Sequence, residues 1–297
     1  MKKTNLLGYI FIILSAVIFG CMPLMADLIY RDGVNALSLV LLRNILSLPP
    51  LMLLGYLGGK TIRIEVRALP WVALVGIFGC ALTPFLLFSS YNYMDSGTAT
   101  VLHFVYPAAV LVIELIFLRA RAELGKIIPI LLCVGGIALF YTPGVGLDLG
   151  GSLIAISSGI VYAVYIVLLG VFSSRFSVNG FLFGFYTTLF ATVALLIVTL
   201  LSGTLSLPGS VGGVLLSFFF AIAVNVGAVI LFQRGAFILG GARASILSTL
   251  EPITSVIVGM LFLSETPSAL TAVGVVLVIS ACVAVAVLDM RREKRKN

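Results

Sequence analysis

Four ionisable side chains lie inside long apolar stretches of this sequence, where charge is otherwise rare. They are Arg43, His103, Glu114 and Glu251. Moving a charged side chain to the centre of a membrane helix costs about 2.5–3.5 kcal/mol. Residues of this kind usually face a cavity or a partner, and many of them bind ions or carry protons. We therefore take these four positions as the first candidates for chemistry.

Glu251 is the strongest candidate, because it precedes Pro252 and the backbone distortion at a proline could open space around its carboxyl group. This group could bind a cation, carry a coupling proton, pair with Arg43, or only hydrogen-bond to a neighbouring helix. Arg43 could hold a substrate carboxylate through two parallel hydrogen bonds. It could equally be held by backbone carbonyls or by an acidic side chain. We predict that both residues serve substrate binding or coupling.

His103 is the single histidine of the chain, and Glu114 lies eleven residues after it. An imidazole ionises near neutral pH, so His103 could serve a proton relay, although one histidine in a helix bundle is often a hydrogen-bonded packing residue. Glu114 is close in sequence to Arg119, Arg121 and Lys126, which favours an ion pair at the membrane interface over a place in a cavity.

Several tyrosines and one asparagine within the apolar stretches are further candidates for a polar cavity. Tyr162 and Tyr165 are three residues apart, so they share one face of a helix and could contact an aromatic ring or a quaternary amine. A buried tyrosine hydroxyl needs a partner, which adds Tyr91 and Tyr106. An unpaired amide in lipid is costly, which adds Asn225.

The composition identifies the environment in which these residues must work. Hydrophobic residues make up 61% of the 297 residues and charged residues only 10%, which is too little polar material to cover a water-soluble domain. A membrane helix needs about 20 apolar residues. Ten such runs are present, and because backbone groups in lipid must be paired internally we expect an all-α integral membrane protein. The runs are 6–26, 36–57, 71–92, 98–118, 127–142, 151–171, 180–201, 211–233, 244–263 and 269–288.

The basic residues predict how these ten helices are oriented. If the N-terminus is cytoplasmic, one side of the membrane holds 16 Lys and Arg residues, the other side holds Arg31 alone, and Arg43 lies within a helix. The 16 are Lys2, Lys3, Lys60, Arg63, Arg67, Arg119, Arg121, Lys126, Arg175, Arg234, Arg243, Arg291, Arg292, Lys294, Arg295 and Lys296. Cytoplasmic loops carry such an excess. The pattern predicts a multi-pass protein of the cell membrane with both termini cytoplasmic, and it explains the basic charge without a nucleic-acid partner.

An internal repeat is visible when the chain is compared with itself. A shift of 143 residues (149 − 6 = 143) or of 145 residues (252 − 107 = 145) aligns identical residue types in the same order. The shift of 143 aligns Leu6, Gly8, Ile13 and Ser15 with Leu149, Gly151, Ile156 and Ser158, and the shift of 145 aligns Ala99, Leu102, Pro107, Phe117 and Leu118 with Ala244, Leu247, Pro252, Phe262 and Leu263. The pattern predicts two copies of one five-helix unit.

Because five is odd, the second copy must enter the membrane from the opposite side. We expect the first repeat over residues 1–143, the second over 149–290, and a basic cytoplasmic tail over 291–297, which could touch lipid headgroups. Inverted repeats of this kind are typical of alternating-access transporters with a site near mid-membrane. Pro107 and Pro252 occupy equivalent places, roughly in the middle of their runs, so we predict that they act as hinges.

Other functional classes have little support in the sequence. The four cysteines fall in apolar runs without metal-binding spacing. A phosphate-binding loop of the GxxxxGK[ST] type is absent, and a single histidine excludes HExxH. We therefore expect no cofactor, no metal and no enzymatic activity. A channel is one alternative, although the sequence contains no filter-like segment. An intramembrane enzyme acting on lipids is another alternative.

Over nearly its whole length the chain resembles the drug/metabolite transporter superfamily, EamA-type branch. The similar features are Ser15-Ala16 to Phe19-Gly20, Arg43, Leu250-Glu251-Pro252 and Leu263-Ser264-Glu265. The first repeat departs from the family pattern at Leu118-Arg119-Ala120, and His103 and Glu114 are not general family features. The resemblance implies gradient-driven transport of small metabolites, often amino-acid export.

The expected function is therefore secondary active transport of a small metabolite, most simply export of an amino acid or related compound. Import or exchange of a cationic or quaternary-amine metabolite is the alternative. Protons are a candidate coupling ion, membrane lipid is the surrounding partner, and the sequence leaves the oligomeric state open.

Overall fold

A computed structural model describes residues 3–59, 63–94, 96–117, 124–139, 148–262, 269–270, 272–281 and 284 of the chain. Within these residues all regular structure is helical. Six helical stretches are long and apolar enough to cross a membrane, namely Asn5–Arg31, Ala36–Gly58, Val66–Ser90, Leu149–Arg175, Gly180–Ser202 and Val211–Leu239. The prediction of an all-helical membrane protein is confirmed.

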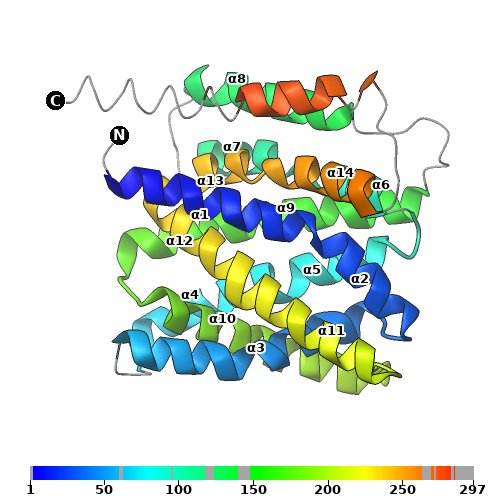
Figure 1. Ribbon diagram of the computed structural model, residues 1–297. Helices are drawn as coiled ribbons and strands as arrows, with labels where there is room; N and C mark the ends of the chain where they lie inside the picture. The colour runs from blue at the N-terminus through cyan, green and yellow to red at the C-terminus, as the bar shows by residue number, and fades with distance from the viewer. Residues whose placement is uncertain are drawn as a thin grey trace.

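The six long stretches contain both continuous and interrupted helices. Three are single helices, α3 (Ala36–Gly59), α9 (Leu149–Arg175) and α10 (Gly180–Ser202). The other three are composite: α1 (Lys3–Gly20) with α2 (Met22–Arg31); η1 (Val66–Ala68), α4 (Leu69–Gly76), η2 (Ile77–Leu82) and α5 (Thr83–Ser90); and α11 (Val211–Ala221), η3 (Ile222–Val229) and α12 (Ile230–Leu239). In Figure 1 these helices run roughly parallel in stacked rows, with α3 packed against α10 and α1 against α12.

Shorter helices occupy the other four expected runs. They are α6 (Ser96–His103) with α7 (Tyr106–Phe117), α8 (Leu124–Ala138), α13 (Gly241–Leu247) with α14 (Leu250–Phe262), and a helical segment over 272–281. α7 packs against α9, and α14 packs against α1. The predicted basic tail over 291–297 lies outside the described residues.

Polar side chains fix where several of the long helices begin. A helix leaves its first N–H groups without backbone partners, and an Asn, Asp or Ser at the N-cap can accept from them. Four helices begin with such an N-cap residue. The acceptors are Asn35 Oδ1 for Ser38 N at 2.8 Å, Asp148 Oδ1 for Gly151 N at 2.6 Å, Asn179 Oδ1 for Phe181 N at 2.9 Å and Ser210 Oγ for Gly213 N at 2.9 Å.

Irregular helix geometry occurs at pairs of positions separated by a constant distance in the sequence. The π-helical segments η2 and η3 begin at Ile77 and Ile222, which are 145 residues apart (222 − 77 = 145). The breaks between α6 and α7 and between α13 and α14 are 144 residues apart, because α7 begins at Tyr106 and α14 at Leu250 (250 − 106 = 144). One offset equals the larger of the two shifts that align the sequence with itself, 143 and 145 residues, and the other lies between them.

Side chains from other helices pair the carbonyl groups of the π-helical segments. A π-helical turn disturbs the regular i→i+4 ladder, and an unpaired carbonyl in a membrane interior costs several kcal/mol. Asn44 of α3 donates to the Cys80 carbonyl at 3.0 Å, and Ser15 of α1 donates to the Ala228 carbonyl at 2.8 Å. Packing between helices therefore stabilises both irregular segments.

Glycines allow the closest approaches between helices. A Cβ atom on Gly76 of α4 would overlap the backbone carbonyl of Thr187 on α10, whereas a Cβ atom on Gly170 of α9 would meet nothing within 4 Å. A backbone carbonyl cannot rotate away as a flexible side chain can. We infer that the contact between α4 and α10 depends on a missing side chain at position 76.

We predict that Gly76→Ala lowers the unfolding temperature of the detergent-purified protein, because the two helices must separate at a cost of about 1–3 kcal/mol. Gly170→Ala is the matched control, and its greater helix propensity should leave the unfolding temperature unchanged or raise it. Nearly equal unfolding temperatures for the two variants would contradict this account of the α4–α10 contact.

Candidate functional site

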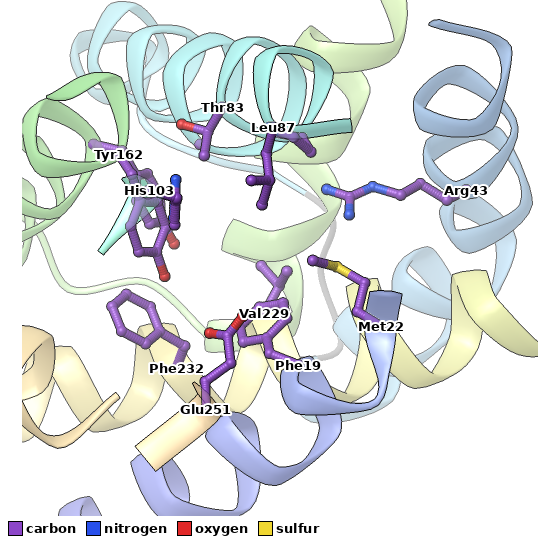
Figure 2. Close-up of a pocket in the computed structure, with 13 residues that line it drawn as sticks. Phe19, Met22, Arg43, Thr83, Leu87, His103, Tyr162, Val229, Phe232 and Glu251 are labelled. Atoms are coloured by element: carbon purple, nitrogen blue, oxygen red, sulfur yellow. The ribbon is translucent and has the colours of Figure 1, made fainter. Parts of the chain in front are cut away.

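A pocket with about 540 Å³ of empty space lies among helices from both halves of the chain. Its walls come from α1, α2, α3, η2, α5, α6, α9, η3, α12 and α14. The polar lining residues are Arg43, Thr83, His103, Tyr162, Tyr165 and Glu251. Figure 2 shows Arg43 entering from one side, His103 and Tyr162 lying together on the other, and Glu251 entering from the side of α14. The 540 Å³ includes space that opens to solvent, so it is not the volume of a closed cavity.

Arg43 brings a buried cation to the pocket wall. Its side chain is 3% exposed, and its Nε atom has no hydrogen-bond partner among the described residues. The guanidinium carbon lies 5.9 Å from the ring centroid of Phe88, which is within the range of a cation–π contact. Within the part of the chain that the structure describes, no ion pair joins Arg43 to Glu251.

Two asparagine side chains and one serine hydroxyl form a hydrogen-bonded cluster next to Arg43, and this cluster holds the α3 backbone in place. Asn225 Nδ2, on η3, lies 2.8 Å from Asn44 Oδ1, 3.2 Å from the Arg43 carbonyl and 3.1 Å from Ser47 Oγ. Asn44 in turn donates to the Cys80 carbonyl on η2. The cluster of Asn44, Ser47 and Asn225, which we term the amide junction, therefore links both π-helical segments to α3 next to the cation.

Glu251 lies in the first turn of α14, directly after the break that separates this helix from α13. The first N–H groups of a helix carry partial positive charge, so a carboxylate is favoured there. The side chain is half-buried and lines the pocket. Among the described residues no hydrogen bond or ion pair is recorded for its carboxyl oxygens, which leaves them facing the space.

Aromatic rings form the wall beside His103. Tyr162 stacks on Tyr165 with ring centroids 5.4 Å apart and 21° between the planes, and it meets Tyr106 edge-on at 4.9 Å. Phe232 lies 5.8 Å from Tyr162. Such a wall can hold an apolar side chain or the face of a cation.

Two serine hydroxyls hold the polar groups on this wall. His103 Nδ1 lies 2.8 Å from Ser158 Oγ on α9, and Tyr106 Oη lies 2.6 Å from Ser248 Oγ in the break before α14. The Tyr106–Ser248 contact joins the two interrupted helices to each other. These contacts position residues around the pocket without filling it.

The predicted site residues divide into two groups. Five of them line the pocket, namely Arg43, His103, Tyr162, Tyr165 and Glu251. Three polar candidates are not part of its lining, because Asn225 belongs to the amide junction, Tyr106 contacts Ser248, and Tyr91 Oη lies 3.4 Å from Thr100 Oγ1.

The two predicted hinge prolines lie in the first turns of α7 and α14. Pro107 is the second residue of its helix and Pro252 the third. A proline in the first turn loses no hydrogen bond, since the first N–H groups have no partner in the helix. In both places the helix is interrupted just before the proline and restarts with it, instead of running continuously through a kink.

Glu114 lies apart from the pocket lining, where its Oε1 atom is 3.6 Å from the position that a Cβ atom of Gly241 would occupy. Arg119 and Arg121 are outside the described residues, as is the side chain of Lys126. Sequence reasoning did not single out Asn44, Ser158 or Ser248. Asn44 follows Arg43 directly inside an apolar run, which was an available signal, whereas the serines are too common in membrane helices to stand out.

The six apolar spans and the shorter apolar helices define a multi-pass membrane protein, and its pocket is lined by both charged and apolar residues. The profile of the EamA-like transporter family matches the chain twice, over residues 6–142 and 149–287. The chain therefore belongs to the EamA-like transporter family, as the resemblance predicted.

Individual relatives agree with this assignment. An uncharacterized transporter of Clostridium kluyveri is 22% identical over 94% of this chain and 91% of its own length. The uncharacterized inner membrane transporter YicL of Salmonella typhimurium is 26% identical over 97% of each chain. An uncharacterized transporter of Haemophilus influenzae is 28% identical, but the match spans only 54% of this chain and 56% of that protein. One solved crystal structure shares the fold, with a TM-score of 0.73 at 18% identity over 98% of this chain and 97% of the other.

We predict energetic coupling between Asn44 and Asn225 in a double-mutant cycle. Asn44→Ala and Asn225→Ala should each destabilise the protein, because each leaves buried polar groups without partners. The double variant should be more stable than the sum of the two losses implies, by about 0.6–1.7 kcal/mol, the range measured for polar contacts between membrane helices. Unfolding of the purified proteins by increasing SDS in mixed micelles measures this, and strictly additive losses would rule the coupling out.

Proposed function

We propose that this protein is a secondary transporter that moves a small amphoteric metabolite, an amino acid or a related compound, across the cell membrane by alternating access. One observation carries the proposal. Arg43 and Glu251 enter the same pocket from different helices, and no ion pair between them is recorded in the described part of the chain. Two unpaired opposite charges inside a membrane protein each favour a ligand group of the other sign.

The charges suggest how the solute lies in the pocket. Its carboxylate would meet the guanidinium group of Arg43, and its ammonium group would meet Glu251 and the face of Tyr162. The aromatic wall of Tyr162, Tyr165 and Phe232 would pack against the remainder of the solute. The loaded pocket would then hold balanced charges, which lowers the cost of carrying the solute past the membrane interior.

Several observations support the topology that this function needs, which is two five-helix repeats over residues 1–143 and 149–290 in opposite orientations. The family profile matches twice, and the π-helical segments and helix breaks recur at offsets of 145 and 144 residues. The six long stretches and the shorter helices would together make ten passes. The excess of basic residues at one side supports cytoplasmic termini, and the name of the Salmonella relative supports the inner membrane.

A hydrogen-bonded contact between the halves is a candidate gate for alternating access. The turn between α2 and α3 meets the loop between α10 and α11, where Asn35 N donates to Ser206 Oγ at 2.7 Å and Asn35 Nδ2 donates to the Thr204 carbonyl at 2.6 Å. Ser206 N donates to Ser38 Oγ at 2.8 Å, and Ser210 N donates to Asp32 Oδ2 at 3.1 Å. We term residues 32–38 and 204–210 the loop clasp. In the proposed topology it lies on the outer face.

The proposed direction is export, as the family resemblance implies, and a proton gradient is the proposed driving force, with Glu251 as the group that carries the proton. The sequence contains no phosphate-binding loop that would supply ATP energy. A carboxyl group that faces a pocket without a hydrogen-bond partner can exchange a proton as the pocket opens to one side and then the other.

We predict that the purified protein in liposomes moves amino acids without ATP, and that Glu251→Gln and Arg43→Ala each reduce the rate at least about tenfold, the effect of losing one charge-assisted contact. Asp27→Asn and Arg31→Ala are matched controls, because this pair lies on the surface with 52% and 72% of the side chains exposed. Full transport by both pocket variants would remove Glu251 and Arg43 from the mechanism.

We further predict that a covalent bond across the loop clasp stops transport. Asn35→Cys with Ser206→Cys, in a background without Cys21, Cys80, Cys133 and Cys282, would be joined by a short bismaleimide and assayed in liposomes. Alternating access requires the halves to separate at one face in each cycle, so the joined protein should be inactive.

The matched control for this experiment joins Asp27→Cys to Arg31→Cys, which lie one turn apart on α2 alone. That bond leaves the halves free, so its transport should continue at the rate of the unjoined protein. Undiminished transport after complete joining of positions 35 and 206 would show that the clasp is not a gate.

A further inference from the structure

His103 is a buried imidazole that the proposed function has not yet used. It is the last residue of α6, its side chain is only 5% exposed, and it lines the pocket on the side of Tyr162. Its ring lies 5.4 Å from the ring of Tyr106 and 5.4 Å from that of Tyr162. A Cβ atom on Gly159 would overlap the His103 carbonyl, so the end of α6 lies directly against α9. The ring is thus held in one orientation.

The hydrogen bonds of Ser158 indicate which nitrogen of His103 carries the proton. A serine hydroxyl has one proton to donate. Ser158 Oγ donates that proton to the Ala155 carbonyl at 2.6 Å. The 2.8 Å contact between Ser158 Oγ and His103 Nδ1 therefore needs the proton of the ring. The neutral imidazole then carries its proton on Nδ1 and a lone pair on Nε2.

The Nε2 atom is the nitrogen that remains for a ligand. The hydrogen bond to Ser158 occupies Nδ1, and among the described residues no protein donor is recorded for Nε2. Nε2 is also absent from the fully buried polar atoms that lack partners in this part of the chain, which agrees with a nitrogen that faces the open space of the pocket. His103 thus presents a fixed hydrogen-bond acceptor to the solute.

We propose that His103 is a specificity-determining residue, which accepts an N–H hydrogen bond from the ammonium group of the amphoteric solute through Nε2. Glu251 supplies the balancing charge, and Tyr162 supplies the aromatic face. The pocket therefore selects an ammonium group that retains at least one N–H and rejects a quaternary amine of the same charge. This inference rests on the proposed function, and it decides between the amino-acid and quaternary-amine substrates.

The physical reason is that charge and hydrogen bonding act separately. A quaternary amine keeps its attraction to Glu251 and to the face of Tyr162. It has no N–H group, so it would strip water from Nε2 and leave the lone pair unpaired. A site built to form a hydrogen bond discriminates strongly against a ligand that lacks the partner, because the buried polar group of the protein is then unsatisfied.

The test compares paired probes on the full-length protein in detergent. Each L-amino acid of a panel with small, aliphatic and aromatic side chains is paired with its N,N,N-trimethyl betaine. Apparent affinities come from the concentration dependence of thermal stabilisation. The variants are His103→Asn, whose amide can still donate to Ser158 but has no group at the place of Nε2, and Ser158→Ala, which leaves the size of the imidazole unchanged and releases its tautomer.

We expect the unaltered protein to bind the amino form about tenfold or more tightly than the betaine, the effect of one hydrogen bond to a charged group. His103→Asn should remove most of this preference, chiefly by weakening the binding of the amino form. Ser158→Ala should reduce the preference without changing the space for the trimethyl group, which separates hydrogen bonding from crowding. If His103→Asn does not fold, the Ser158→Ala variant alone tests the role of His103.

Other outcomes overturn the inference in distinguishable ways. The unaltered protein could bind both members of a pair with equal affinity, or both variants could keep the preference. Either result would show that His103 does not recognise the ammonium group, and it would leave the proposed function intact. Stabilisation by neither amino acids nor betaines would overturn the proposed function itself, and the role of His103 with it.

Discussion

The structure depends on one constraint, which is that polar groups inside a membrane must find partners within the protein because lipid supplies none. Helices satisfy the backbone over most of the described chain. Where the helices become irregular, side chains from neighbouring helices provide the missing donors, as Ser15 does for Ala228 and Asn44 does for Cys80. Most other buried hydroxyls donate to a carbonyl three or four residues earlier in their own helix, as Ser47, Ser90 and Thr192 do.

Among the described residues, buried polar atoms without partners also occur away from the pocket, on Thr199, Ser217, Asn225 and Gln233, but two charged groups without a recorded ionic partner both lie in it. Arg43 retains an unpaired Nε atom, and no partner is recorded for the Glu251 carboxyl group among the described residues. Pairing the two charges would have been the simplest way to satisfy both, and the packing holds them on different walls instead. The amide junction holds the backbone of α3 at Arg43, and the helix break places Glu251 in the first turn of α14. The two charges are thus held apart, as the proposed binding of an amphoteric solute requires.

The irregular helices explain how the pocket can lie among so many elements. The segments η2 and η3 and the breaks before α7 and α14 all occur next to residues that line it or support it. Each irregularity turns side chains that a continuous helix would direct elsewhere. Their recurrence at offsets of 144–145 residues means that each of these irregularities has a counterpart in the other half of the chain. Exchanging the roles of such counterparts is the simplest physical basis for two alternative states.

Some features of the site followed from residue types, and others depended on packing. Charge is so costly in lipid that Arg43, His103, Glu114 and Glu251 stood out from the sequence; three of them line the pocket, and Glu114 lies apart from it. Asn225 stood out because an unpaired amide is also costly, and its amide group donates to the backbone carbonyl of Arg43. The matched prolines lie in the first turns of α7 and α14, after breaks in the helices, and their predicted role as hinges stays a prediction. The free-energy cost of an unpaired polar group in lipid shows that the group needs a partner, but it does not show which partner the group has.

The sequence by itself determined that lipid surrounds this protein, its helical class and the few ionisable residues within its apolar runs, because hydropathy and charge are properties of single residues and short runs. Only the tertiary structure decided that Arg43 and Glu251 face one space without pairing, that Ser158 Oγ meets Nδ1 of His103, and that Asn44 contacts both π-helical segments. These facts depend on distances between atoms far apart in the chain, and only the packing of the helices sets those distances.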